Sequence, residues 1–526
     1  MEEGTDAVAT TASVGPAPTP ALASTPAPVP VPVPTSTPGR PDAGRWAGAD
    51  DRRRWLVLGV VAVGSVMSTL DTFIVNVAVP SLRRGLHASP GEAELVVTTY
   101  SLVYAVLLIT GGRLGDLYGR SRVFVVGMVG FTAASAACGV APSPTFLVVA
   151  RAVQAAGAAV MVPQAYAVVQ QVFRPTERVR AISYLTTAAS LAVVLAQLVG
   201  GGLIQLDLFG LGWRTVFFVN VPFGVAGVAG ALLLLPRTGP ERRATVDVGG
   251  VALATAALLM VVVPLTEGRD LGWPPWLLGI LATSPVVFAT FVRSQRSRAA
   301  RGLMPLVDLA LFKVRSFSAG VTLAGFGQMS NAGLFFVLAV YLQSGRGLSP
   351  GAAGLAFAPL GVGYMCVALF SPRLSGRFGR AVITTGYVVV GVALGSMVVV
   401  LHLAAGGSPY WLVPSVALVG AGQGLVNSPL FATVLSRVRH GHEGAASGVM
   451  TTAQQTGSAV GVALEGLVFY SALGVAGAVG SRVAPAVASD AFAGALWLNL
   501  AFVLVAVVLV RLLPARPTAG GPARAS

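Results

Sequence analysis

The feature that most constrains this chain is a series of long apolar runs that contain almost no charged residue. Each run is close to the ~20 residues that a helix needs to cross a bilayer. Only 10% of the residues are charged, whereas a soluble domain carries about 25%. The mean hydropathy is +0.77. The sequence therefore predicts an all-α integral membrane protein, because helices satisfy their own backbone hydrogen bonds in lipid.

The apolar runs and the charges between them predict a topology. Most of the 35 basic residues fall in every second connection between the runs, which is the asymmetry typical of cytoplasmic loops. This bias predicts that both chain termini are cytoplasmic. We expect fourteen spans, near 55–80, 94–112, 123–141, 145–170, 181–205, 213–235, 247–266, 273–292, 317–342, 351–371, 381–402, 410–435, 444–471 and 491–513.

An internal repeat suggests how the spans are grouped. The segment Arg113–Arg120 aligns without gaps on Arg373–Arg380, and each copy follows the second helix of a six-helix set if the seventh and eighth helices are an insertion. Such repeats mark secondary transporters, whose substrate site lies between two halves near the membrane midplane. The predicted domains are a disordered Pro/Ala-rich tail at 1–51, a six-helix bundle at 52–235, two inserted helices at 236–300, a second bundle at 301–513 and a tail at 514–526.

Several kinds of chemistry are excluded by residue usage. Cys138 and Cys366 both lie in apolar runs, and the four histidines lack metal-ligand spacing, so we expect neither a disulfide framework nor a metal site. Lys313 follows Phe312 rather than glycine, which excludes a P-loop for ATP. The basic clusters serve orientation. We therefore expect no nucleic-acid partner and no cofactor, with the proton gradient as the energy source.

Motifs that occur in order along the chain resemble those of the major facilitator superfamily, and specifically its fourteen-span drug–proton antiporter branch. The resemblance covers nearly all of the chain after about residue 55. It implies two pseudo-symmetric six-helix bundles with two inserted helices, which export an amphipathic drug or antibiotic in exchange for protons by alternating access. The matching segments are Leu70–Pro80, Gly112–Arg120, Arg151–Gln154, Gly212–Gly224, Pro305–Asp308, Leu311–Phe312, Gly354–Pro359 and Gly444–Gly448 with Gln455 and Gly457.

Two positions depart from the family's pattern. Ala155 follows Gln154 where glycine is usual, and Ala196-Gln197 stand where antiporters usually have Gly-Pro. We therefore keep proton-coupled uptake of a metabolite as an alternative direction of transport. A membrane enzyme would need a catalytic constellation that we do not find, and a sensor would need a signalling domain, whereas the N-terminal tail is simple in composition.

Three charged residues lie deep in predicted spans. Asp71 lies well inside the first span, where a carboxylate costs about 3 kcal/mol on insertion scales. We predict that it carries the proton, although hydrogen bonding to Asn76 or to a neighbouring helix would make it merely structural. The resemblance implies that Arg151 takes part in proton coupling, and the alternative is a snorkelling arginine. Glu465, the only other acid that we place deep in a span, either handles protons and favours cationic substrates or pairs structurally with Arg151.

Uncharged polar residues inside the spans are candidates for lining a substrate cavity. Each could equally join two helices by hydrogen bonds. The glycines around Gln423, in Gly420–Gly424, favour close helix packing over a nucleotide loop. The candidates are Asn76, Gln154, Gln197, Gln328, Asn331, Tyr341, Gln454 and Gln455.

The loop after the second span is predicted to act as a conformational latch. Its glycines permit a tight turn, and Asp116 can meet a helix N-terminus or an arginine of the opposite half. The second copy of the repeat has Gly376 in place of Asp116, so the latch should be one-sided. The predicted latch consists of Gly112, Arg113, Gly115, Asp116, Gly119 and Arg120.

The setting follows from composition. Arginine in place of lysine, with abundant Ala, Gly, Val and Pro, is typical of a GC-rich genome. We expect a multi-pass protein of a bacterial inner (plasma) membrane. Its predicted partners are protons, a small-molecule substrate and the lipid bilayer, and we expect a monomer.

Overall fold

Helices make up almost all of the computed structural model, which describes residues 51–236, 246–403, 407–435, 443–474 and 484–514. Within these ranges, thirteen helices are long and apolar enough to cross a membrane, and one bent helix makes a fourteenth. The predicted all-α membrane fold is confirmed, and the predicted fourteen spans agree with this count. Apart from Asp51 and Pro514, the predicted tails lie outside the described residues, and the predicted domain boundaries stay predictions.

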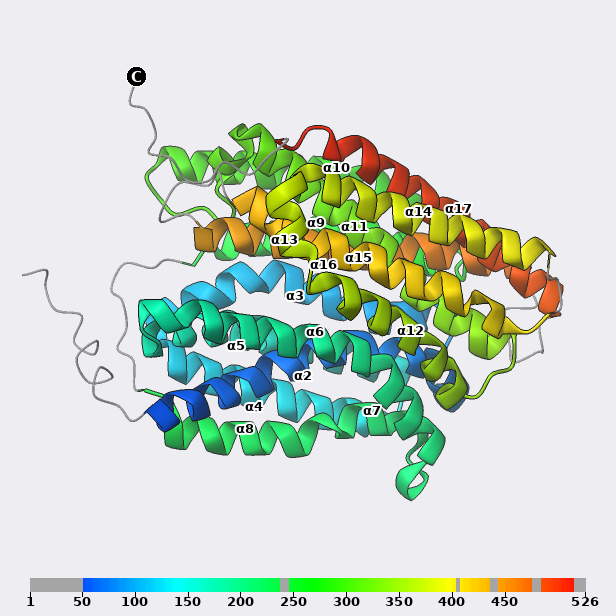
Figure 1. Ribbon diagram of the computed structural model, residues 1–526, viewed down its shortest axis with the longest axis horizontal. Helices are drawn as coiled ribbons and strands as arrows, with labels where there is room; N and C mark the ends of the chain where they lie inside the picture. Colours follow the sequence, from blue (N-terminus) through cyan, green and yellow to red (C-terminus); the bar gives the residue numbers. More distant parts are fainter. Residues whose placement is uncertain (1–50, 237–245, 404–406, 436–442, 475–483, 515–526) are drawn as a thin grey trace, which may run out of the picture.

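The first six spans pack as one group, in the lower part of Figure 1. The fifth span bends by 44° around residue 194, although the Gly-Pro pair of the family's pattern is absent. The helices of this group are α2 (Asp51–Leu86), α3 (Pro90–Tyr118), α4 (Arg120–Gly139), α5 (Pro144–Val172), α6 (Pro175–Leu206) and α8 (Asn220–Leu234), which follows the short α7 (Thr215–Phe218).

The last six spans form a second group that meets the first along two seams, where α3 packs on α16 and α6 packs on α12. Gly201 on α6 lies against the backbone of Pro350, so that a Cβ there would overlap it. Such close approach of small residues is how helices pack in lipid. The second group consists of α11 (Arg315–Val340), α12 (Pro350–Ala368), α13 (Ser371–Phe378), α14 (Arg380–Leu403), α15 (Val413–Leu435), α16 (Glu443–Leu473) and α17 (Pro485–Val510).

The two inserted helices, α9 (Val248–Glu267) and α10 (Pro275–Ala300), pack on each other, and α9 also packs on α3 and α16. Asp247 caps α9, accepts hydrogen bonds from Gln295 and from the backbone N–H of Leu306, and pairs with Arg298. Burial acts to raise the pKa of Asp247, but these hydrogen bonds and the arginine outweigh it and hold the pKa below its ordinary value. These contacts fasten the start of α9 and the end of α10, which together form a helical hairpin, to the segment that leads into α11.

The turn of the hairpin is fastened to α3. Asp270 accepts a hydrogen bond of 2.9 Å from the backbone N–H of Gly91 and pairs with Arg269. Burial acts to raise the pKa of Asp270, but the hydrogen bonds from Arg269 and Gly91 hold it below its ordinary value. The guanidinium of Arg269 also lies 4.9 Å from the ring centre of Tyr470 on α16. The inserted helices therefore contact both groups.

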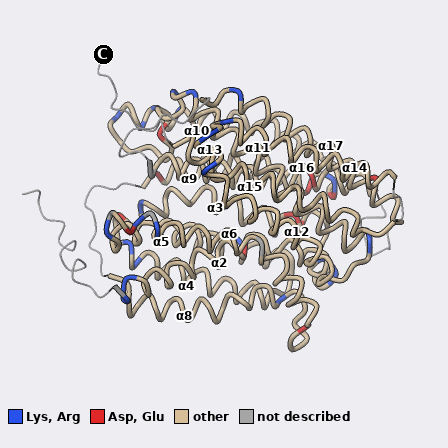
Figure 2. The backbone as a smooth tube through the Cα atoms, in the orientation of Figure 1, with Lys and Arg blue, Asp and Glu red and all other residues tan. Residues whose placement is uncertain are grey.

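The internal repeat has a structural counterpart. Gly119 joins α3 to α4 with φ 92°, and Gly379 joins α13 to α14 with φ 57°. A residue with a Cβ would be strained at both places. The two glycines occupy the same position in the aligned copies, so the repeated sequence encodes a repeated turn. Figure 2 shows Lys and Arg gathered mainly at the end of the helices where α2 begins.

Candidate functional site

Asp71 lies on α2 inside the first group of helices and has no exposed surface. Its Oδ2 accepts a hydrogen bond of 2.5 Å from Nη1 of Arg151. Its Oδ1 accepts hydrogen bonds from the amides of Gln154, at 2.8 Å, and Asn220, at 3.0 Å. The carboxylate is therefore held by one cation and two amides that come from α5 and α8.

Arg151 is the cation of this network and is also buried. Its Nε donates to the carbonyl of Val96, and its Nη1 also donates to Oε1 of Gln154. The guanidinium lies 4.3 Å from the ring centre of Tyr100 and 5.7 Å from that of Phe217. Because Arg151 and Gln154 are three residues apart, they share one face of α5, as the sequence predicts. The alternative of a snorkelling arginine is wrong.

A serine hydroxyl connects the two amides of this network. The Oγ of Ser135 on α4 accepts from Gln154 at 3.0 Å and from Asn220 at 3.1 Å, and it donates to the carbonyl of Phe217. A change in the charge of Asp71 would therefore alter hydrogen bonds that involve α2, α4, α5 and α8. The carboxyl group of Asp71 can take up one proton. Protonation would remove the negative charge that pairs with Arg151.

Glu465 forms a separate site in the second group. It lies on α16 without exposed surface, and its Oε1 accepts a hydrogen bond of 2.7 Å from Asn499 on α17. Asn499 also donates to the carbonyl of Ser330 and accepts from its hydroxyl at 2.5 Å. The Oε2 of Glu465 has no hydrogen-bond partner in the described structure. The alternative that pairs Glu465 with Arg151 is wrong, because Arg151 pairs with Asp71 and Glu465 accepts its hydrogen bond from Asn499.

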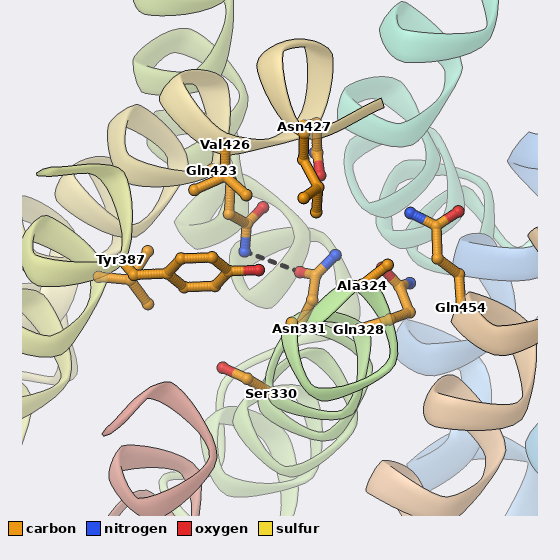
Figure 3. Close-up of a pocket in the computed structure, with 12 residues that line it drawn as sticks. Ala324, Gln328, Ser330, Asn331, Tyr387, Gln423, Val426, Asn427 and Gln454 are labelled. Carbon is orange, nitrogen blue, oxygen red and sulfur yellow. Dashed lines mark hydrogen bonds between the residues drawn. The ribbon is translucent and has the colours of Figure 1, made fainter. Parts of the chain in front are cut away.

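A polar cavity lies in the second group, and three predicted cavity residues line it: Gln328, Asn331 and Gln454. Figure 3 shows them with Gln423 and Asn427, whose amides the sequence analysis did not single out as cavity candidates. Neither Glu465 nor Gln455 lines this cavity.

The remaining candidates lie elsewhere. Gln197 donates to the carbonyl of Phe73 and so joins α6 to α2. Tyr341 stacks on Phe492 and shares a hydrogen bond with Ser489. Asn76 is buried, but the groups that bind Asp71 are Arg151, Gln154 and Asn220 rather than this amide. Gln197 therefore acts between helices, as the alternative interpretation holds, whereas Tyr341 both joins helices and lines a second, smaller pocket with Ser489.

The predicted latch makes a different contact from the expected one. Asp116 pairs with Arg120 of its own half at 3.2 Å. Arg113, instead, reaches beyond the first group of helices and donates a hydrogen bond to the carbonyl of Pro305, in the segment between α10 and α11. Among the predicted latch glycines, Gly115 lies against Gln164 of α5, Gly112 faces Pro163, and Gly119 forms the turn.

Sequence reasoning missed several polar groups. Asn220 and Ser135 are uncharged, and the one available signal was a polar residue within an apolar helix. Glu94, near the start of α3, is also buried and lies near Gly466 of α16, and the sequence analysis did not single it out. Glu94 stands at the start of a predicted span, where side chains normally contact water, so its position in the sequence gave no reason to expect burial.

Comparisons with known proteins point to one family. Residues 61–462 match the sequence profile of the Major Facilitator Superfamily. The probable actinorhodin transporter of Streptomyces coelicolor is 40% identical over 80% of this chain and 73% of its own length. The tetracenomycin C resistance and export protein of Streptomyces glaucescens is 33% identical over 80% of this chain and 77% of its own. The cephamycin export protein CmcT of Amycolatopsis lactamdurans is 33% identical over 91% and 96%.

Solved structures agree in fold. A D-xylose–proton symporter superposes with a TM-score of 0.62 at 15% identity, covering 88% of this chain and 98% of the other. A bacterial homologue of the human lysosomal transporter Spinster, in an inward-facing conformation, gives 0.60 at 17% identity over 88% and 98%. At these identities the likeness shows the fold alone.

Proposed function

Because this chain belongs to the Major Facilitator Superfamily, we propose that it exports an amphipathic small molecule, a drug or antibiotic, in exchange for protons. Family membership makes the chain a membrane transporter and not an enzyme. Relatives named for export or resistance support the outward direction. Transport proceeds by alternating access, in which the two groups of helices open the substrate site first to one side of the membrane and then to the other.

The observation that carries proton exchange is the buried pair of Asp71 and Arg151. When Asp71 is ionised, the pair and its two amide donors tie α2, α5 and α8 together. When Asp71 is protonated, Arg151 loses its only ion-pair partner in the described structure, and the tie weakens. A charge change that biases packed helices in this way is a two-state switch. In this conformation Asp71 is shielded, so protons reach it only as the helices rearrange.

The energetics of a single proton are sufficient for export. One proton that crosses about 100 mV supplies ~2.3 kcal/mol. At about 1.4 kcal/mol per decade, this energy sustains a roughly fortyfold substrate gradient.

The proposal includes the setting of the protein. We place the chain in a bacterial inner membrane with both termini in the cytoplasm, on the side where its basic residues gather. It acts as a monomer, with protons, the transported molecule and the bilayer as partners. The proton gradient is its energy source and no bound cofactor takes part.

The test uses inverted membrane vesicles from cells that express the full chain, with an acidic lumen. The added probes are actinorhodin and tetracenomycin C, and the readouts are probe uptake and collapse of the pH gradient measured with a fluorescent amine. Wild-type vesicles should take up a probe and lose the gradient faster after its addition. Asp71→Asn should abolish both effects, because the amide cannot release a proton.

The matched control is Asp490→Asn, since Asp490 is an exposed acid on α17. It should behave as wild type. Coupled uptake that survives in Asp71→Asn refutes the role of Asp71. Probe accumulation in right-side-out vesicles that is driven by external acid, without the reverse reaction, would instead establish uptake.

A further inference from the structure

The polar cavity of the second group is built from the inner faces of α11, α14, α15 and α16 (Figure 3). None of the described residues that line it carries a charge. Its apolar part comes from small and branched side chains such as Val390 and Val426, beside the ring of Tyr387. Its polar part consists mainly of the five side-chain amides of Gln328, Asn331, Gln423, Asn427 and Gln454.

Three of these five amides form no hydrogen bond with other described residues. Gln423 donates a hydrogen bond of 2.8 Å to Asn331. The amides of Gln328, Asn427 and Gln454 have no hydrogen-bond partner among the residues that the structure describes. At membrane depth a polar group without a partner is costly, and such groups face water or a ligand. The cavity thus presents unused donors and acceptors.

The packing of α15 explains why its amides face inward. Gly420 and Gly424 lie against the backbone of α12, and Gly422 lies against the backbone of α14. These two contact faces leave the side with Gln423 and Asn427, one helical turn apart, turned to the cavity. The glycine run therefore positions a recognition surface as well as packing the helices closely.

The buried acid of this half is withdrawn from the cavity. Ser330 lines the cavity, Asn499 lies behind Ser330, and Glu465 lies behind Asn499. A cationic ligand in the cavity would therefore meet no counter-charge within hydrogen-bond reach among the lining residues. This placement removes the reason to expect a cationic substrate.

We infer that this cavity binds the polar edge of an uncharged ring compound that carries both hydroxyl and carbonyl groups, and that such compounds are the transported class. Amides donate and accept at once, so they match a ligand with both kinds of group. The cavity has a volume of about 30 Å³ and is bordered by the ring of Tyr387 and two valines, so in this conformation it admits the polar edge of such a compound and not its whole ring system. This inference rests on the proposed export function and names its substrate class.

The experiment measures equilibrium binding to the purified full chain in lipid nanodiscs. The two probes are 1,8-dihydroxyanthraquinone, which is neutral, and ethidium, which is a flat cation of similar size. We expect the wild type to bind the neutral probe at least about tenfold more tightly. Gln454→Met and Asn331→Leu should each weaken neutral binding by about tenfold, since a hydrogen bond contributes roughly one decade of affinity.

The matched control is Gln455→Met, one residue further along α16 and outside the cavity lining, which should bind as wild type. Asn331→Leu also removes a hydrogen bond within the protein, so Gln454→Met decides the result if Asn331→Leu does not fold. Tighter binding of ethidium, or unchanged neutral binding in Gln454→Met, overturns the inference. Asp71→Asn should bind the neutral probe normally and yet fail in proton exchange, so this variant separates failure of the cavity from failure of the coupling.

Discussion

Each group of helices buries a carboxyl group inside one of its spans, Asp71 in the first and Glu465 in the second, but the two groups surround it differently. Asp71 is paired with Arg151 and receives two further amide hydrogen bonds. Glu465 receives one hydrogen bond, from Asn499, and no described cation pairs with it. The first site is a closed electrostatic network, whereas the second is a short chain of hydrogen bonds that joins Glu465, Asn499 and Ser330.

The difference shows how the same functional group is used in two ways. A buried ion pair is stable only while both partners stay charged, because removing one partner leaves the other uncompensated. A carboxyl group without a counter-charge in an apolar site is better accommodated in its neutral form. The first half therefore holds a carboxylate whose charge is matched by Arg151, and the second half holds a carboxyl group without a described counter-charge and a cavity whose described lining is uncharged.

The largest expected effect on stability comes from removing the cation of the first site. Arg151→Met leaves Asp71 buried without a cation and should lower the free energy of unfolding by about 3–5 kcal/mol. The double variant Arg151→Met/Asp71→Leu should recover most of that loss. Denaturation of the purified proteins in detergent, followed by tryptophan fluorescence, measures both. Equal stability of the single and double variants would contradict the ion-pair assignment.

A smaller effect is expected when the hydrogen-bond donor of the second site is removed. Asn499→Leu leaves Glu465 and Ser330 without their shared partner, at a cost of about 1–3 kcal/mol. The same denaturation assay applies, with the exposed Asp490→Asn as control. A cost as large as that of Arg151→Met would mean that the second site is charged as well.

The conservative change at Glu465 should cost still less. Glu465→Gln keeps an oxygen that accepts from Asn499 and removes no ion pair, so stability should change by about 1 kcal/mol or less. Asp71→Asn, in contrast, strands Arg151 and should be several times more costly. Comparing the two melting temperatures sharpens the contrast, and similar shifts would remove it.

The smallest effect concerns Asp270, a paired acid at the membrane surface. Its pKa is held below the ordinary 3.8 by Arg269 and Gly91 against the effect of burial, so its stabilisation is present above pH 3.8 and is lost as the pH falls through the lower folded value. Asp270→Asn should cost at most about 1 kcal/mol at pH 7, and the cost should shrink as the pH falls below 3.8. Melting curves over a series of pH values test this, and a cost that does not decrease toward acid pH contradicts it.

The candidate site could be predicted in part. Asp71 and Arg151 stand out because a charge in an apolar run is costly wherever the helix faces. Their pairing was not predictable, since residues 71 and 151 lie on different helices whose rotation about their axes is set by packing. Asn220 joins the same carboxylate from a third helix, and nothing in its local sequence distinguishes an amide bound to Asp71 from one that lines a cavity, such as Asn331.

The sequence by itself determined the number and approximate positions of the spans and the turn at Gly119. The thickness of the bilayer fixes how long an apolar run must be, and a backbone with positive φ fixes where glycine is needed. Only the tertiary structure decided that Arg151 belongs to Asp71, that Glu465 stands behind Ser330, and that Gln454 rather than Gln455 lines the cavity. Hydrophobicity places a helix in the membrane, but the side that it turns to its neighbours is chosen by close packing and by hydrogen bonds between helices.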